Sequence, residues 1–293
     1  MKTITALIQR EYLEHKGAFL YAPAVILGLL TLVLLTATGI DRPRLPTGIA
    51  VNSGKVVEVA FLAVAALWFV YLLAALFFYF ADAFNADRRN NAMLFWKSMP
   101  VSDFTVLGAK LLAGLTIFPA LILVAVLINA VLLVVFALFT AWQLPGMVPP
   151  DLLTVLGAGG QVGLFAIVSM LLALLWYAPF FAWVGMLSTL VGRWSIPLAF
   201  LIPGMIGLFE KLTFGAGDFD RGYFLTWIGE RLHFGLDREL FADEFLTPTR
   251  FEAVPAVARL LTVVDWTQFF GGLAVAMLLV YAASEYRRRF IAA

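Results

Sequence analysis

The sequence predicts an all-α integral membrane protein, and two observations carry that prediction. Of the 293 residues, 62% are hydrophobic and only 13% are charged, whereas about a quarter of the residues in a soluble domain are charged. The hydrophobic residues also form long unbroken runs, whereas strands of a transmembrane barrel would alternate with period two. We therefore expect one membrane domain, residues 1–293, built from six transmembrane helices.

The N-terminal residues 1–16 predict a short amphipathic helix. Ile4, Leu7 and Ile8 recur at helical spacing, and the charges lie elsewhere, which is typical of a helix at a membrane surface. The next apolar run, 18–37, has about 20 residues, whereas the apolar core of a secretory signal has about 7 to 15. We expect this run to be the first transmembrane helix and not a cleaved signal.

The remaining apolar runs predict five more crossings, separated by polar, Pro- and Gly-rich loops such as 41–55 and 142–160. In the second of these loops we expect a short helix that begins at Asp151. The third crossing exceeds the roughly 20 residues that a bilayer requires, so we expect it to tilt or project, with a kink near Pro119. The fifth is short and contains two prolines, so a re-entrant helix is the alternative there. These five predicted spans are 57–80, 111–140, 161–191, 195–209 and 267–283.

The segment 210–265, between the last two predicted spans, is the longest polar part of the chain. Its apolar residues recur at helical spacing around Phe224 and Trp227, and again within 254–266. This pattern predicts short amphipathic helices packed on the surface of the membrane, on its outer side.

The distribution of Lys and Arg predicts the orientation. With the N-terminus inside, eleven of the 20 basic residues fall on the inner side and nine on the outer side. Six of those nine lie in the long segment 210–265, and the positive-inside rule discounts long loops. We therefore expect both termini in the cytoplasm, and a multi-pass protein of the bacterial cytoplasmic (inner) membrane.

Several kinds of chemistry lack their sequence motifs. The chain has no G-x-x-x-x-G-K-[ST] phosphate-binding loop, no H-E-x-x-H zinc motif and no G-x-S-x-G nucleophile motif. Its two histidines, His15 and His233, fall on opposite sides of the predicted membrane, and it has no cysteine. We therefore expect no catalytic residues, no metal site and no cofactor bound by this chain, and nothing in its charge implies nucleic acid.

The centres of the predicted spans contain no Asp, Glu, Lys or Arg, although ion-coupled carriers place such groups there. Energy for transport would therefore come from another subunit. Asn129 is the most central polar side chain. An interhelical hydrogen bond is its ordinary explanation, and a contact with a transported substrate is the alternative.

The stretch 82–112 is a short polar segment between two predicted crossings, and it is unusually rich in charged and aromatic residues. A short helix is expected from Asp87 to about Ser98, ended by Pro100. Ser102 is then expected to cap a new helix with Asp103 in its first turn. The helix before Pro100 is either a rigid docking element or an ordinary amphipathic surface helix.

The runs REYLEHKG at 10–17, DRRNNAMLFWKSMPVSD at 87–103 and LWYAPFFAW at 175–183 resemble the type-2 permease subunits of ATP-binding-cassette exporters. The resemblance implies six crossings, an N-terminal elbow helix, a cytoplasmic coupling helix between spans two and three, and short outer helices between spans five and six. It also implies a second permease subunit, homologous or identical, and two copies of a cytoplasmic ATPase that holds the ATP and Mg. The residues implied to contact the ATPase are Arg10, Glu11, Asp87, Arg88, Arg89, Asn90, Asn91, Leu94, Phe95, Trp96, Lys97 and Ser98.

Two functions of other classes remain as alternatives at this stage. One is a membrane scaffold or assembly subunit that transports nothing, and the other is a lipid-modifying membrane enzyme. The enzyme would need a convergent cluster of polar side chains, which the sequence does not indicate. The apolar spans favour a hydrophobic or amphipathic cargo, and export as the direction follows from the resemblance alone.

Overall fold

The computed structural model describes residues 2–38, 53–89, 101–143, 151–214, 223–232, 234 and 249–290. All regular structure in these ranges is helical, which confirms the all-α prediction. The helices are α1 (Lys2–Glu14), η1 (Gly17–Tyr21), α2 (Ala22–Thr38), α3 (Ser53–Arg89), α5 (Asp103–Leu115), α6 (Ile117–Gln143), α7 (Leu152–Val191), η2 (Gly192–Trp194), α8 (Ser195–Phe214), α9 (Tyr223–Leu232), α11 (Ala253–Val263) and α12 (Trp266–Phe290).

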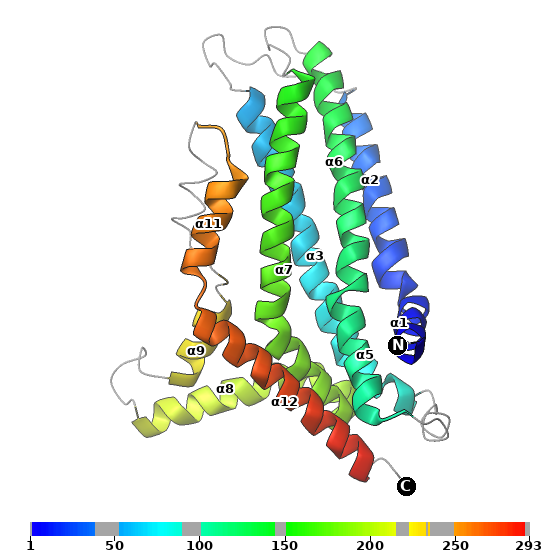
Figure 1. The fold of residues 1–293 in the computed structure, drawn as a ribbon, viewed down its shortest axis with the longest axis vertical. Helices are drawn as coiled ribbons and strands as arrows, with labels where there is room; N and C mark the ends of the chain where they lie inside the picture. The colour runs from blue at the N-terminus through cyan, green and yellow to red at the C-terminus, as the bar shows by residue number, and fades with distance from the viewer. Residues whose placement is uncertain are drawn as a thin grey trace.

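The long helices α2, α3, α6 and α7 run side by side and form an elongated bundle (Figure 1). Its main core is aromatic and aliphatic, with Trp68 and Leu72 of α3 and Leu174 of α7 at its centre. The first predicted crossing is confirmed as one helical run, because η1 and α2 together cover Gly17–Thr38. The predicted amphipathic helix at the N-terminus is also helical as α1, and its Leu7 packs against α5.

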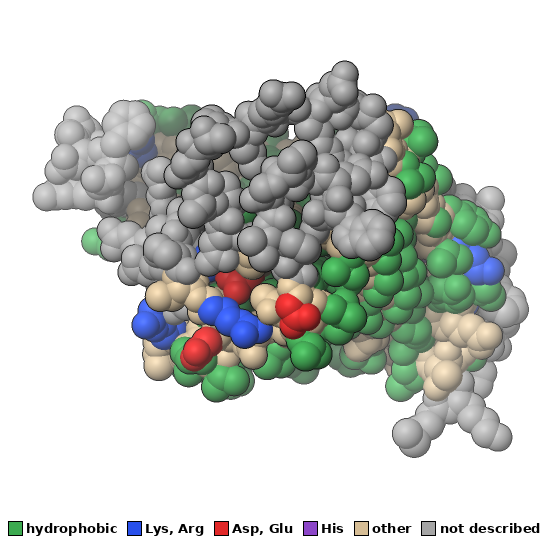
Figure 2. Space-filling model, turned by 90° about the horizontal axis from the view of Figure 1, so that it is seen from above, with side chains coloured by type: hydrophobic (Ala, Val, Ile, Leu, Met, Phe, Trp, Pro, Cys, Tyr) green, Lys and Arg blue, Asp and Glu red, His purple; other side chains and the backbone are tan. Residues whose placement is uncertain are grey.

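Figure 2 views the end of the bundle from above. Hydrophobic side chains cover a large part of the described surface there, and acidic and basic side chains gather along one edge (Figure 2). Large exposed hydrophobic residues also follow the long helices, for example Val33 of α2, Val70 of α3 and Val131 of α6. A continuous apolar surface of this extent suits contact with lipid tails.

Helix α7 begins where a short helix was expected, after Asp151, but it continues much farther. The sequence indicated that this helix is separate from the span beginning at residue 161, whereas one helix of 40 residues runs from Leu152 to Val191. One of the glycines that suggested a loop instead faces a neighbouring helix closely. A Cβ atom at Gly159 would lie 3.1 Å from the ring of Phe61 on α3, so this glycine allows α3 and α7 to approach each other.

The third predicted crossing is two helices. Helix α5 ends at Leu115, Thr116 adopts a non-helical conformation, and α6 begins at Ile117. Pro119 therefore lies in the first turn of α6 and not within a kinked helix. Proline is tolerated there because first-turn amides have no partner within the helix.

Five helical segments of the described chain are long and apolar enough to cross a membrane, whereas six were predicted. The fourth and fifth predicted spans merge into one helical stretch, Leu152–Thr213. It bends at Gly192, whose φ of 60° suits a residue without a side chain. Beyond this bend α8 lies across the lower end of the bundle (Figure 1). The other four segments are Gly17–Thr36, Gly54–Asp87, Asp103–Leu138 and Trp266–Phe290.

The predicted outer segment contains the two expected helices, α9 and α11. Their position differs from the prediction, because α11 lies lengthwise beside α7 and not across its end (Figure 1). The cause is a buried apolar face that includes Ala253, Ala256 and Leu260. In addition, the side-chain oxygen of Gln161 accepts a 2.7 Å hydrogen bond from the amide of Ala253.

Candidate functional site: a buried ionic cluster

Six charged side chains from four helices meet where the two ends of the chain come together. We call this set the buried ionic cluster. Four of its members are almost fully buried, with 1 to 3% of their surface exposed. The cluster consists of Arg10 and Glu11 on α1, Asp87 on α3, Asp103 and Lys110 on α5, and Arg287 on α12.

Arg287 holds carboxylates from both sides of the predicted docking segment. Its Nη1 donates a 2.9 Å hydrogen bond to Asp87 Oδ2, and its Nε lies 2.7 Å from Asp103 Oδ1. The second contact is close but poorly aligned for a hydrogen bond, and Nη2 donates to no described group. One guanidinium group therefore joins the two residues that flank 88–102.

Lys110 links α5 to the N-terminal helix. Its ammonium group donates a 2.7 Å hydrogen bond to Glu11 Oε1 and lies 3.8 Å from Asp87 Oδ2. The other oxygen of Glu11 accepts a 3.0 Å hydrogen bond from the hydroxyl of Tyr79. Both oxygens of this buried carboxylate are thus bound within the chain.

Local sequence explains how each helix presents its charge. The side chain of Ser102 accepts a hydrogen bond from the amide of Thr105, which confirms the predicted cap of α5. The cap places Asp103 in the first turn, and Lys110, seven residues later, lies on the same helical face. At the rim Arg10 pairs with Glu14 at 2.7 Å and lies 3.7 Å from Asp87.

Aromatic rings close one side of the cluster. Phe19 stacks on Phe118 with ring centroids 3.9 Å apart, and His15 meets the edge of Tyr79 at 4.7 Å. The four buried members of the cluster therefore make their ionic contacts in a medium of low dielectric constant. Removing one member of such a buried pair leaves an uncompensated charge, which typically costs about 3 to 5 kcal/mol.

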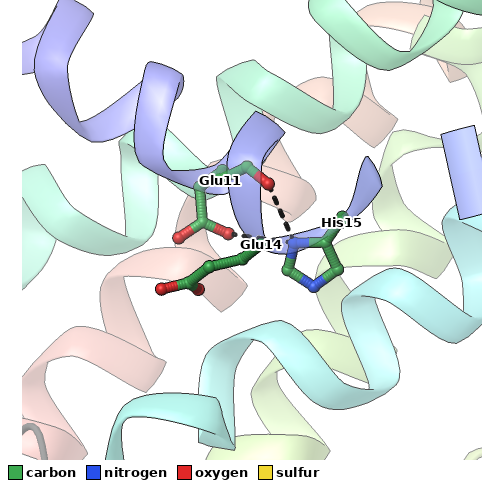
Figure 3. A group of neighbouring side chains, drawn as sticks. All are labelled: Glu11, Glu14 and His15. Carbon is green, nitrogen blue, oxygen red and sulfur yellow. Dashed lines mark hydrogen bonds and ion pairs between the residues drawn. The ribbon is translucent and has the colours of Figure 1, made fainter. Parts of the chain in front are cut away.

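Glu11, Glu14 and His15 form a potential metal-binding group, since their ligand atoms lie within 4.8 Å of one another. Figure 3 shows the three side chains on one helix, with His15 Nδ1 turned toward Glu11. That nitrogen lies 3.0 Å from the backbone oxygen of Glu11, so it serves as a donor in this contact and is not free for a metal. Because Lys110 already neutralises Glu11, we assign no metal to this group.

The predicted docking segment begins differently from the prediction. Asp87 was expected in the first turn of a separate helix, but it lies in the last turn of α3, which ends at Arg89. Asp87 and Glu11, both predicted to contact a partner, are buried and bound to residues of this chain. The side chains of Arg88 and Arg89 are not described, and Asn90, Asn91, Leu94, Phe95, Trp96, Lys97 and Ser98 lie outside the described residues.

Sequence reasoning did not single out Lys110, Tyr79 or Arg287 as site residues. A weak signal was present in Lys110, because it is a lone charge in the apolar stretch VLGAKLLAGL. Arg287 is one of three consecutive arginines, and the sequence does not distinguish it from its neighbours. Arg288 and Arg289 are exposed and both bind Glu285 at 2.6 Å.

Asn129, the predicted polar residue within the spans, is buried in α6 with 2% of its surface exposed. It is not part of the ionic cluster, and it does not line the cavity between α3, α6 and α7. The structure thus provides no contact between Asn129 and a site.

Comparisons with known proteins identify no relative. The chain gives no significant match to any family model, curated protein or solved structure.

Proposed function

We propose that the chain is the membrane-spanning permease subunit of an ATP-binding-cassette exporter. It would pair with a second permease subunit and with two cytoplasmic ATPase subunits. The sequence resemblance motivates this proposal. The observation that carries it is the double contact of Arg287 with Asp87 and Asp103, because these residues flank the segment that resembles a coupling helix.

The ionic cluster gives this segment a physical connection to the membrane helices. A force on residues 88–102 would act on Asp87 and Asp103, and through Arg287 it would reach α12. Lys110 and Glu11 extend the connection to α1. Alternating access requires such a link, since a ligand bound outside the membrane can shift the helices only through differential contacts.

The course of the chain supports an even number of crossings. Arg10 of α1 and Arg287 of α12 contact the same carboxylate, so both ends of the chain lie at one end of the bundle. Helix α7 finishes at this end, whereas Thr249 binds Lys55 at the opposite end of α3. Gly192 and Thr249 thus lie toward opposite ends of the bundle, and the proposal counts the chain that connects them as the fifth of six crossings.

The proposal assigns different roles to the predicted contact residues. Glu11 and Asp87 act inside the chain, where their carboxylates are bound. The outward-facing contact is left to the aromatic pair Phe95 and Trp96 and its neighbours. The partner ATPase would hold ATP and Mg, since this chain has no phosphate-binding motif.

The proposal is tested by purifying the full chain from its native membranes in nanodiscs. We expect an ATPase with a phosphate-binding loop to co-purify. Replacing Phe95 and Trp96 with Ala should abolish its binding or its stimulation by the permease. The matched control replaces Tyr223 and Trp266, which are exposed at other sites, and should leave both properties intact.

Two results would overturn the proposal. One is a folded chain that purifies without an ATPase, which would favour a scaffold or assembly subunit. The other is unchanged ATPase binding and stimulation in the Phe95 and Trp96 variant, which would refute the docking role. Turnover of a lipid by the purified chain alone would instead favour a lipid-modifying enzyme.

A further inference from the structure

A short strap joins α3 to α7 at the end of the bundle opposite the ionic cluster. We use this name for residues 249–253, which lead into α11 beside α7 (Figure 1). The amide of Phe251 donates to both carboxylate oxygens of Glu58 on α3, at 3.3 and 3.2 Å. Two residues later, the amide of Ala253 donates to the side-chain oxygen of Gln161 on α7, at 2.7 Å. Side chains of two different long helices thus bind alternate amides of the strap.

The side chain of Phe251 packs against the same two helices. Only 2% of this residue is exposed, and its ring lies edge to face with that of Phe165 on α7, with centroids 5.6 Å apart. Phe251 also belongs to one hydrophobic cluster with Phe61 of α3. The strap therefore holds the two helices by hydrogen bonds and by apolar contact, and both must be lost before it can leave.

The carboxylate of Glu58 has a cation on its own helix. Lys55, one turn earlier on α3, donates a 3.0 Å hydrogen bond to Glu58 Oε2 and another of 3.0 Å to the backbone oxygen of Thr249. If the strap moves away, the pair of Lys55 and Glu58 stays together, and Gln161 loses only a neutral amide. Release of the strap therefore leaves no buried charge without a counter-charge.

The ionic cluster is connected in the opposite way. Arg287 lies on α12, whereas the carboxylates that it contacts lie on α3 and α5. Parting these helices would leave charges without partners in a buried site, which is strongly unfavourable. Losing hydrogen bonds to neutral groups, or to a carboxylate that keeps its cation, is less unfavourable. Of the two connections, the strap is the one suited to open and close.

We infer that the strap is a releasable clasp for α3 and α7. When the strap is bound, it holds the first turns of these helices together, and when it leaves, they can part. The use of this clasp rests on the proposed function, because this end of the bundle faces outward in the exporter and has to open for the cargo to leave. Release itself is a property of one chain, so it can be measured without an ATPase or a cargo.

The test places spin labels at introduced cysteines in the full chain in nanodiscs, since the chain has no cysteine of its own. Val56 and Leu153 are exposed in the first turns of α3 and α7, so the distance between labels there reports on the end that carries the strap. Phe104 of α5 and Tyr281 of α12 are exposed on two helices that the ionic cluster joins. Labels there report on the other end.

Two substitutions weaken the strap without changing a charge. Phe251→Ala removes the buried ring, and Gln161→Ala removes the acceptor of the Ala253 amide. In the double variant we expect a second population with a longer distance at the end that carries the strap, and an unchanged distance at the ionic cluster. Glu252→Ala is the matched control, because its exposed side chain makes no cap hydrogen bond. It should leave both distances as in the native chain.

Hydrogen exchange in the native chain tests release without any substitution. We expect the amides of the strap to exchange by local opening, about tenfold or more faster than amides in the middle of α7. Exchange as slow as that of α7 would show that the strap opens only when the whole chain unfolds, and it would overturn the inference. An unchanged distance between the labels at Val56 and Leu153 in the double variant, with faster exchange of the strap, would also overturn it.

These results are separate from the test of the transport function. A longer distance at the end that carries the strap, in a double variant that purifies without an ATPase, would support the clasp and refute the exporter. A bound ATPase together with an unchanged distance in the double variant would overturn the clasp alone.

Discussion

The buried ionic cluster and the site of Arg231 both contain a buried arginine, but the two arginines are stabilised in different ways. In the cluster, Arg287 contacts two carboxylates, Asp87 and Asp103. Arg231 of α9 meets no carboxylate among the described residues. Its Nη1 and Nη2 donate to the backbone oxygens of Gln268 and Trp176, at 2.8 and 3.0 Å.

The surroundings of Arg231 fit a charge stabilised by dipoles and rings. The guanidinium lies 4.7 Å from the centroid of the Trp176 ring and 5.8 Å from that of Trp227, within the range of cation–π attraction. Burial lowers the pKa of Arg231 from its ordinary value, since desolvation disfavours the charged form. The two sites therefore differ in what a substitution leaves behind. Removing Arg231 leaves only neutral backbone oxygens without a hydrogen-bond donor, whereas removing Arg287 leaves carboxylates without their shared counter-charge.

The largest expected effect is that of Arg287→Met. Asp87 and Asp103 lose their shared cation, so we expect the free energy of unfolding to fall by about 3 to 5 kcal/mol. Denaturant titration in detergent measures it. The exposed neighbour Arg288 gives the control, because Arg288→Met should change stability by less than about 1 kcal/mol. Similar losses in the two variants would show that Arg287 is not buried in an ionic cluster.

The pair Lys110 and Glu11 should behave as a coupled unit. Lys110→Met leaves the buried carboxylate of Glu11 unpaired, and Glu11→Gln leaves the ammonium group with only the more distant Asp87. The double variant should therefore be more stable than the sum of the two losses predicts, by about 1 to 3 kcal/mol. A double-mutant cycle of unfolding free energies measures this coupling, and strict additivity would contradict the contact.

Arg231→Met should have a smaller effect, about 1 to 3 kcal/mol, because it leaves two backbone oxygens unpaired but no charge. Gly272→Ala sharpens the test, since its Cβ atom would clash with Arg231 Nη2 and would push the guanidinium from its place. In an Arg231→Met background the same alanine should cost less. If Gly272→Ala lowers the free energy of unfolding equally in both backgrounds, Arg231 does not pack against Gly272.

The smallest expected effect is that of Ser102→Ala, which removes the cap of α5 but none of the charges. We expect a loss of about 1 kcal/mol in unfolding free energy. Ser102→Asp retains a capping oxygen and should restore most of the stability. If Ser102→Ala and Ser102→Asp are equally destabilised, the cap does not stabilise the start of α5.

Local signals in the sequence predicted local features correctly. The cap at Ser102 and the apolar runs around α2, α3, α6 and α12 require only neighbouring residues to be recognised. The continuity of α7 beyond its first turns was missed, because a glycine such as Gly159 occurs both in loops and where helices pack closely. Only the ring of Phe61 on another helix decides between the two.

The ionic cluster could not be predicted, for a related reason. Lys110 and Glu11 are 99 residues apart, and Asp87 and Arg287 are 200 residues apart. The sequence shows charges near the ends of apolar runs, but their pairing depends on how the helices assemble. Of the three consecutive arginines, Arg287 is the one that is buried, because the orientation of α12 about its axis turns this side chain toward the bundle.

The central claim is that Arg287 transmits movement of the segment 88–102 to the membrane helices. The chain has no cysteine, so spin labels can be placed at introduced cysteines alone. Phe104 and Leu153 are exposed and lie in the first turns of α5 and α7, two helices that begin near opposite ends of the bundle (Figure 1). The measurement is the distance between labels at these two positions in the proposed complex with the ATPase, with and without nucleotide. The distance is compared between the native arginine and Arg287→Lys, which keeps the charge but lacks the planar fork that can bind two carboxylates.

We predict that nucleotide shifts this distance by several ångströms in the native chain and not in Arg287→Lys. The same shift in both chains would contradict the claim, as would no shift in either.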